Sequence, residues 1–379
     1  MQARWNVIFS CLVGLWTGCL SPRPTDNNSG SAAHTDAASR EPLCESTAPV
    51  HFIVLTNFEG FRRSSAESPG TETLLSEEIS LPLSWDELVL SWNANAPAGT
   101  HFKFEARAIY PDHRTAFYTL GLWSENGQPR ESVNGQKDQD GDVKTDTLVL
   151  QRPARAVQVR IRCFSGEAGV QPLLKFLGLS FLNSSVDWCD TTTDRVAWGK
   201  SLAVPERSQI AYPGGRGWCS PTSVSMVLAY WAKALGRAEL DIDVPEVAKA
   251  VTDPNWPGTG NWPFNTAFAG HFPGMRACVT RLRGVSQLEQ WINAGVPVIL
   301  SVSSRLLHGK DEAEEGGHLV ACAGFTSEGN PIVNDPWAHL DRGERVQRVF
   351  PRANLVKAWR HSRNTVYLIY PESTPAPGW

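Results

Sequence analysis

The spacing of hydrophobic and polar positions divides the chain into two unlike halves. Between His51 and Asn183, apolar residues alternate with polar ones in short runs. This period of two is typical of β-strands that bury one face. The runs predict seven strands: His51–Thr56, Glu87–Trp92, Thr100–Tyr110, Phe117–Trp123, Thr145–Leu150, Ala156–Cys163 and Leu174–Leu182. Turn-forming residues separate them and no helical period interrupts, so we expect an antiparallel β-sandwich domain of unknown role over residues 44–190.

Beyond Asn183 the spacing becomes helical. Val224, Val227, Leu228 and Trp231 recur at the interval of one buried helix face. Further helices are predicted to begin at Asp243 and Asn261 and to run over Ser286–Gly295. Five strands should follow: Val296–Val302, His318–Phe325, Pro331–Asn334, Arg345–Phe350 and Val366–Tyr370. Helices followed by antiparallel strands predict an α+β fold for a second domain, residues 205–371.

The first 43 residues have the character of a targeting segment and a tether. Arg4 precedes a short apolar stretch that ends in small residues, as in a secretory signal peptide over residues 1–19. Gly18–Cys19 resembles a bacterial lipobox, which would make Cys19 a lipid attachment site at the membrane; the alternative is plain secretion. Residues 20–43 are polar and predict a flexible tether. We therefore expect an exported protein, either secreted or lipid-anchored at the cell envelope.

Composition and charge narrow the classes of partner. The chain has 379 residues, 41% of them hydrophobic and 20% charged, as in a soluble globular protein of two domains. A formal net charge of −4 argues against nucleic acid as a partner. The acidic run Asp138–Asp142 could hold calcium, but it lacks the spacing of an EF-hand, so a solvated loop is the preferred interpretation. No cysteine pair has the spacing of zinc ligands, and we expect neither a metal nor another cofactor.

Export makes disulfides chemically reasonable. Cys44 precedes the first predicted strand and Cys189 follows the last, so we expect these two to be joined. The rival pairing is Cys163 with Cys189, and Cys278 could pair with Cys322 across the second domain. Cys163 and Cys322 lie within predicted strands and could equally be buried thiols.

One cysteine has the setting of a nucleophile. Cys219 follows a glycine-rich turn and Trp218, and Pro221 suits the first turn of the helix that begins there. Free backbone N–H groups and the positive end of the helix dipole favour a thiolate at this place. The alternative is a small buried cysteine that happens to begin a helix.

A cysteine nucleophile needs a base, and the base needs an orienting group. His318 begins a predicted strand after two glycines, where the sheet would fix it facing a cleft; His271 is the second choice. A hairpin should bring His318 next to Asp335, with Asn334 as the alternative orienter. The backbone N–H of Cys219 and the side chain of Gln209 are the candidates for an oxyanion hole.

These motifs carry a family resemblance. Trp218-Cys219-Ser220-Pro221, Gly317-His318-Leu319-Val320 and Asn334-Asp335-Pro336 together resemble the papain-like cysteine peptidases. The nearest branch is the bacterial one related to the bacteriocin-processing, double-glycine-leader peptidases. The resemblance covers roughly residues 205–371 and implies the order Cys219, His318, Asp335 for the catalytic residues. It does not cover the predicted sandwich.

Three functions fit these observations. The first is an exported thiol hydrolase that cleaves peptide or amide bonds of a peptide or protein substrate through an acyl-enzyme on Cys219. The second is an acyl or peptidyl transferase on the same fold. The third is a non-catalytic surface-binding protein, in which the sandwich would contact carbohydrate or cell wall by analogy with other such folds. The sequence does not separate the first two, and the third leaves the Cys219, His318 and Asp335 pattern unexplained.

Overall fold

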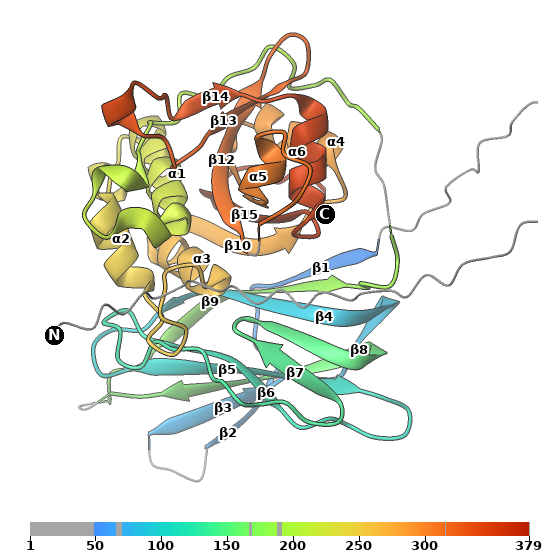
Figure 1. Ribbon diagram of the computed structural model, residues 1–379. Helices are drawn as coiled ribbons and strands as arrows, with labels where there is room; N and C mark the ends of the chain where they lie inside the picture. Colours follow the sequence, from blue (N-terminus) through green and yellow to red (C-terminus); the bar gives the residue numbers. More distant parts are fainter. Residues whose placement is uncertain (1–48, 66–69, 167–168, 188–191, 315, 379) are drawn as a thin grey trace, which may run out of the picture.

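The N-terminal domain is organised by two long strands, β4 (Ile79–Asn95) and β8 (Thr147–Phe164). The computed structural model describes residues 49–65, 70–166, 169–187, 192–314 and 316–378. The first part of β4 pairs with β8, and its second part pairs with β9. In the same way β8 pairs first with β4 and β7 and then with β3 and β5. Because each long strand changes partners along its length, the nine strands form one hydrogen-bonded antiparallel sheet that folds over itself (Figure 1).

The remaining strands of this domain are short. They are β1 (Val50–Leu55), β2 (Arg62–Ser65), β3 (Thr71–Leu75), β5 (His101–Ile109), β6 (Tyr118–Trp123), β7 (Gly141–Lys144) and β9 (Leu173–Leu182). Aromatic side chains fill the core between the folded layers. Trp92 stacks on Phe104 with 4.0 Å between ring centroids, and both are fully buried. Burial of such rings is a large share of the stabilisation of a β domain.

One difference from the expected strands has a clear cause. The sequence predicts separate strands at 145–150 and 156–163, whereas β8 runs through both. Pro153 lies between them and has no N–H to donate. The β4–β8 register shifts between Trp85 and Glu87, opposite this point, so the ladder passes the proline as an irregularity instead of ending there.

The second domain has a six-stranded antiparallel sheet in the order β10-β15-β11-β12-β13-β14. Its strands are β10 (Met275–Arg281), β11 (Val298–Val302), β12 (His318–Phe325), β13 (Pro331–Asn334), β14 (Gln347–Val349) and β15 (Thr365–Pro371). Its helices are α1 (Cys219–Leu235), α2 (Val244–Val251), α3 (Trp262–His271), α4 (Val285–Asn293), α5 (Ser304–Leu307) and α6 (Arg352–Arg360). The α+β class, with an antiparallel sheet domain ahead of a second domain of helices and antiparallel strands, is confirmed.

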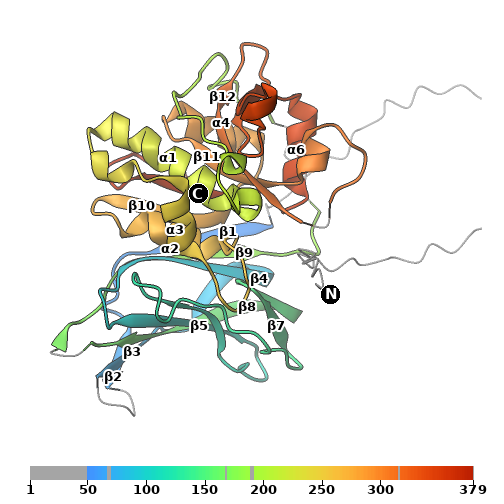
Figure 2. The same ribbon diagram turned by 60° about the vertical axis from the view of Figure 1, so that its left-hand side comes forward.

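The two domains pack through α3 and β10, which lie over β4 and β9 (Figures 1 and 2). Asn93 of β4 makes a two-way contact with β10: its amide nitrogen donates to the carbonyl of Ala277 at 2.7 Å, and its oxygen accepts from the N–H of Ala277 at 3.1 Å. Gly270 of α3 permits this approach, because a Cβ there would lie 2.0 Å from the Asn93 amide. The interface is therefore built for close contact.

The cysteines of the described residues are unpaired. Cys163, Cys278 and Cys322 are buried free thiols, so the pairing of Cys278 with Cys322 is wrong, whereas the rival pairing of Cys163 involves Cys189, which lies outside the described residues. The sheet register explains the first case. Cys278 is opposite Leu368, and Val298 lies between Leu368 and Cys322, so two strands separate the thiols. The path from β10 to β12 crosses three interstrand spacings of nearly 5 Å each, or about 14 Å, far beyond a disulfide. Cys19, Cys44 and Cys189, with the signal and tether segments, lie outside the described residues.

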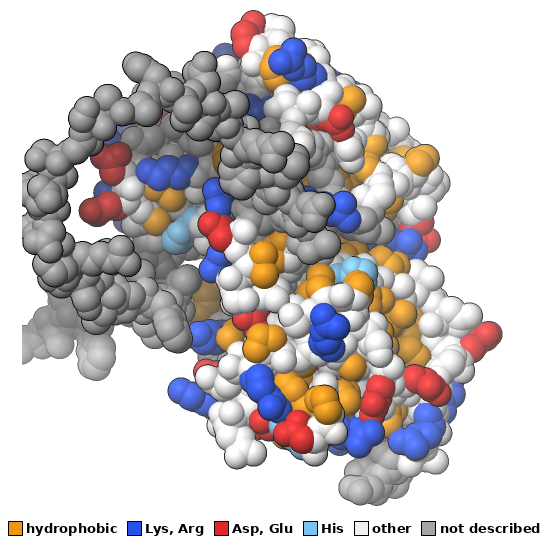
Figure 3. Space-filling model, turned by 90° about the vertical axis from the view of Figure 1, so that its right-hand side faces the viewer, with side chains coloured by type: hydrophobic (Ala, Val, Ile, Leu, Met, Phe, Trp, Pro, Cys, Tyr) orange, Lys and Arg blue, Asp and Glu red, His pale blue; other side chains and the backbone are white. Residues whose placement is uncertain are grey.

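Two further observations bear on partners. Among the helices of the described residues, none has the length and apolar character needed to cross a bilayer. On the face seen in Figure 3, lysine and arginine side chains are interspersed with aspartate and glutamate.

Candidate active site

The turn before α1 places Cys219 at the first helical residue. Gly214 adopts a left-handed conformation with φ of 81°. At Gly215 the chain passes so close to the backbone of Gln209 that a Cβ would lie 1.9 Å from that carbonyl oxygen. The N–H of Trp218 then closes the turn on the carbonyl of Gly215 at 2.9 Å. The glycines are needed for this path, which delivers the thiol to the positive end of the helix as expected.

His318 is held at the start of β12 and is 7% exposed. It is opposite Val302 of β11, so the sheet fixes its backbone. Its Nε2 lies 2.8 Å from Oδ1 of Asp335. Its other ring nitrogen, Nδ1, is therefore the one available to Cys219, whose thiol and the imidazole shift each other's pKa.

Asp335 lies next to His318 as expected, but the strand register that places it there differs from the expected one. The β12–β13 hairpin is present, but Asn334 is opposite Ala321 and not His318. The register breaks between Cys322 and Gly324, and Asp335 itself lies just beyond β13. Its N–H donates to the carbonyl of Val346, and its Oδ1 also accepts from the N–H of Trp337 at 2.9 Å. Backbone contacts on both sides thus fix the carboxylate against the imidazole.

The charges of the three groups support one another. Burial alone would raise the pKa of Cys219, but the hydrogen bond and charge of His318 outweigh it and hold that pKa below its usual value. The backbone N–H groups of Leu319 and Ser220 also lower this pKa. Burial alone would lower the pKa of His318, yet Asp335 raises it. The pKa of Asp335 is depressed in return, since His318 outweighs the burial of the carboxyl. A thiolate–imidazolium pair is the state that this arrangement favours.

Two family models match the chain on either side of residue 190. Residues 201–367 match the model described as the Peptidase_C39-like family, and residues 52–181 match the one described as the Peptidase C39 N-terminal domain. The protein is a C39-like, papain-like cysteine peptidase. The family models carry this assignment, and they imply a peptide or protein substrate.

Comparisons with individual proteins add less. A solved structure described as a candidate C39-like peptidase from Bacillus anthracis is 16% identical and covers 45% of this chain and 95% of that chain, with a TM-score of 0.35. None of the curated proteins compared with the peptidase matches it.

The other residues considered for the site lie as follows. The Gln209 amide donates both hydrogens to backbone carbonyls, to Gly215 at 3.0 Å and to Arg216 at 2.8 Å. In this conformation the Gln209 amide stabilises the turn before Cys219. To donate to an oxyanion, it would have to break one of these two hydrogen bonds. The amide of Asn334 donates to the carbonyls of Val204 and Pro205, and within the described residues no hydrogen bond joins its side chain to His318. His271 ends α3, where it contacts the rings of Phe268 and Phe272.

The other expected oxyanion donor, the backbone N–H of Cys219, is available. Within the described part of the chain, the N–H of Cys219 has no acceptor, because it belongs to the first turn of α1. It is therefore available to bind an oxyanion formed at the carbon that the sulfur attacks. The candidate oxyanion hole begins with this N–H, whereas a role for Gln209 stays a prediction.

The sequence interpretation did not single out a second histidine beside the catalytic carboxylate. Nε2 of His308 lies 3.6 Å from Oδ2 of Asp335. His308 follows α5, and its Nδ1 lies 2.8 Å from the carbonyl of Ser304. It appeared in the sequence only as one of several histidines after Cys219, and no spacing linked it to Asp335.

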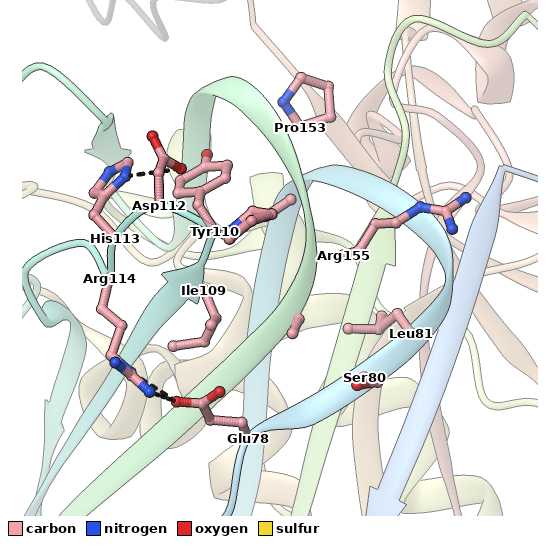
Figure 4. A pocket seen from close by; sticks show the side chains of 13 residues that line it. Glu78, Ser80, Leu81, Ile109, Tyr110, Asp112, His113, Arg114, Pro153 and Arg155 are labelled. Atoms are coloured by element: carbon pink, nitrogen blue, oxygen red, sulfur yellow. Dashed lines mark hydrogen bonds and ion pairs between the residues drawn. The ribbon is translucent and has the colours of Figure 1, made fainter.

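A hollow on the N-terminal domain is separate from this site. It measures about 730 Å³ and lies between the end of β5, the start of β4 and the middle of β8 (Figure 4). Tyr110 lines it, but the ring is 7% exposed and contacts both His113 and Arg152. It offers no open aromatic face of the kind on which sugars stack.

The acidic run near this hollow is a turn. Oδ1 of Asp138 accepts from the hydroxyl of Tyr118 and from the N–H groups of Asp140 and Gly141. In the described ranges, no group of three histidine, cysteine or acidic side chains is placed to hold a metal ion.

Proposed function

We propose that this peptidase is exported and cleaves peptide bonds through an acyl-enzyme on Cys219. The observation that carries the chemistry is the chain of contacts from the partly exposed Cys219 to the buried His318 and Asp335. A thiolate made by the imidazole, and an imidazolium held by a carboxylate, are what covalent acyl transfer requires.

The first step forms a bond between Sγ of Cys219 and the carbonyl carbon of the substrate. The carbonyl oxygen gains the electron pair, and the N–H of Cys219 stabilises the resulting oxyanion. When the C–N bond breaks, the imidazolium of His318 gives its proton to the departing amine and a thioester remains. Water then attacks the thioester while His318 removes its proton, and collapse releases the carboxylic acid and the thiolate. Asp335 stabilises each imidazolium that forms.

The acyl-enzyme can be tested without knowing the natural substrate. We expect p-nitrophenyl acetate to give a burst of about one p-nitrophenol per enzyme and an acetyl group on the peptide that contains Cys219, seen by mass spectrometry after acid quenching. C219S should give neither. Peptide-bond cleavage is tested in parallel by digesting a library of proteome-derived peptides with the wild type and C219A. A burst that persists in C219S, or cleavage that persists in C219A, would refute the proposal.

Export and membrane attachment are supported by the sequence of residues 1–19 alone. Intact-mass analysis of the mature protein from its own host tests them. We expect a chain that lacks the signal, with a mass increase of a diacylglycerol group if Cys19 is lipidated. A full-length chain retained in the cytoplasm would overturn this part of the proposal.

A further inference from the structure

Loop 252–261 joins α2 to α3 and touches both domains. In Figures 1 and 2 it extends from the two helices toward the N-terminal domain. Its other end leads into α3, which packs beside α1, the helix that begins with Cys219. A segment in this position can transmit the docking of one domain to the catalytic site of the other.

The loop is organised around a buried carboxylate. Asp253 is fully buried, and its Oδ1 accepts from the N–H groups of Asn255 and Trp256 within the loop. Its Oδ2 accepts from the side chain of Asn261 at 3.1 Å. Asn261 in turn caps α3 by accepting from the N–H of Phe264. One side chain therefore joins both ends of the loop, as buried carboxylates do when their hydrogen bonds are satisfied.

The N-terminal domain supplies the remaining partners through segment 130–134. The N–H of Ser132 donates to Oδ1 of Asp253 at 3.1 Å, and the carbonyl of Ser132 accepts from the amide of Asn255 at 2.8 Å. The amide of Asn134 donates to the carbonyl of Asn255 at 2.9 Å. These three hydrogen bonds therefore join the N-terminal domain to Asp253 and Asn255, in the first part of the loop.

Arg130 extends the same contact to the end of α2. Its Nη2 donates to the carbonyl of Lys249 at 2.8 Å and its Nε to the carbonyl of Thr252 at 3.2 Å. The carbonyl of Lys249 belongs to the last turn of α2, and the carbonyl of Thr252 follows the helix. Carbonyls at these positions lack partners within the helix. An arginine of one domain thus caps a helix of the other, at the residue that precedes Asp253.

At its far end the loop contacts the chain that leads to the nucleophile. The hydroxyl of Thr259 donates to the carbonyl of Gly217 at 2.9 Å, two residues before Cys219. Thr259 is itself held by the amide of Asn265 in α3, which donates to its carbonyl at 2.8 Å. A continuous set of hydrogen bonds therefore runs from segment 130–134 through Asp253 and Thr259 to the turn before Cys219.

We propose that the N-terminal domain forms part of the catalytic apparatus: segment 130–134 fixes loop 252–261 as one wall of the substrate cleft beside Cys219. This inference rests on the proposed acyl-enzyme function, since it assigns the loop to the cleft of that reaction. Arg130, Asp253 and Thr259 act as positioning residues. They touch no reacting atom but set where the substrate chain lies relative to the sulfur, and misplacement by an ångström is costly in such reactions.

The alternative is that the interface contributes only to stability. The interface itself provides a matched control, because Asn93 also makes two cross-domain hydrogen bonds, to Ala277 of β10 and away from loop 252–261. R130M and N93A each remove two such bonds. T259V removes only the contact with Gly217 and preserves the shape of the side chain.

The test uses the full-length peptidase and two readouts that need no known substrate. Hydrogen exchange of backbone amides reports the loop and residues 212–220. The rates at which N-ethylmaleimide and the much bulkier fluorescein-5-maleimide label Cys219 report the width of the cleft, since the other described cysteines are buried. We expect R130M to speed exchange in loop 252–261 and in residues 212–220, and to raise labelling by the bulky reagent about tenfold relative to the small one. R130K should restore part of the effect.

T259V should loosen residues 212–220 and widen access to Cys219 while leaving exchange at 252–258 unchanged. N93A should speed exchange around Ala277 only, with the ratio of the two labelling rates unaltered. With any peptide that the enzyme cleaves, R130M and T259V should raise KM more than they lower kcat.

The proposal is overturned if R130M is folded and leaves both exchange near Cys219 and the labelling ratio unchanged, or if N93A changes them as much as R130M does. Failure of the proposed chemistry gives a different result. In that case C219S would retain activity or the p-nitrophenol burst, whereas the exchange pattern of R130M would be unaffected.

Discussion

The start of α1 holds a partly exposed thiol and the interior of the six-stranded sheet holds two buried ones, and the two environments have opposite effects on the pKa of a thiol. At the helix start, the charge and hydrogen bond of His318 outweigh the burial of Cys219 and lower its pKa. In β12, burial raises the pKa of Cys322 to about 12, and burial likewise raises the pKa of Cys278 in β10. The three thiols belong to one domain, so neither the residue type nor the domain fold decides how reactive a cysteine is. The charge of the neighbouring side chain decides it.

Buried carboxylates show the same contrast. Asp335 faces an imidazolium, which depresses its pKa despite burial. Asp146 lies at the domain interface, where it accepts from the N–H of Trp262 at 2.8 Å, and burial raises its pKa to about 6. Backbone N–H groups contact both carboxylates, so the difference comes from the cation. Desolvation disfavours the charged form of either group unless an opposite charge is held beside it.

The largest effect should come from removing the reactive thiol. We expect C219A and C219S to lower kcat/KM by about 10⁴-fold or more, because the nucleophile and base act as a unit. The matched control is C322A, which removes a buried thiol from the same domain. It should leave activity unchanged and cost about 1 kcal/mol of unfolding free energy, measured by urea denaturation. Normal turnover by C219S would show that the lowered thiol pKa has no catalytic purpose.

Removing the imidazole should be nearly as damaging and should make Cys219 resemble the inert thiols. In H318A the group that lowers the thiol pKa is absent, so alkylation of Cys219 by iodoacetamide should require a higher pH than in the wild type. Activity should fall by a factor on the order of 10⁴. H271A tests the other candidate base: full loss of activity in H271A, with activity retained in H318A, would mean that the wrong histidine has been assigned.

Neutralising the carboxylate tests how much of the contrast depends on Asp335. D335N keeps the shape of the side chain but removes the charge that raises the pKa of His318. We expect activity to fall, by about one order of magnitude less than in H318A. The descending limb of the pH–activity profile should move to lower pH, because the imidazolium loses its proton more readily. An unchanged descending limb would show that Asp335 does not set the charge of His318.

Much of this site could be predicted from sequence because its parts are local. The glycines before Trp218 and the helical spacing after Cys219 identify a helix start, and the strand that begins at His318 was predicted with its observed bounds. The hairpin to Asp335 was expected as well, but its register was not. The break near Gly324 depends on the chain crossing there, since a Cβ at Gly324 would lie 2.2 Å from the carbonyl oxygen of Lys200.

The elements that escaped prediction derive their stability from distant partners. β10 has a charged residue at its last position, Arg281, whose side chain is buried against Glu87 of the other domain at 2.7 Å. In α6 the buried residues Leu355, Ala358 and Trp359 occupy one face of a helix of only nine residues. The contacts of segment 130–134 are more distant still, since Ser132 and Asp253 are 121 positions apart in the chain. Local periodicity carries no information on such pairs.

The smallest expected effect is a change in unfolding free energy with pH. It concerns Asp146, whose buried carboxylate is not fully balanced by a positive charge. An acid whose pKa is raised in the folded state holds a proton that the unfolded chain has released. Asp146 therefore contributes stability below its unfolded pKa, near 4, and this contribution is lost as the pH rises toward its folded value of about 6. Between about pH 5 and about pH 7, the wild type should lose roughly 1 kcal/mol more unfolding free energy than D146N does. Urea denaturation at the two pH values measures this difference, with D142N in the neighbouring strand β7 as the control. The interpretation fails if D146N and the wild type change equally with pH, because the domain interface would then hold Asp146 with no preference for its neutral form.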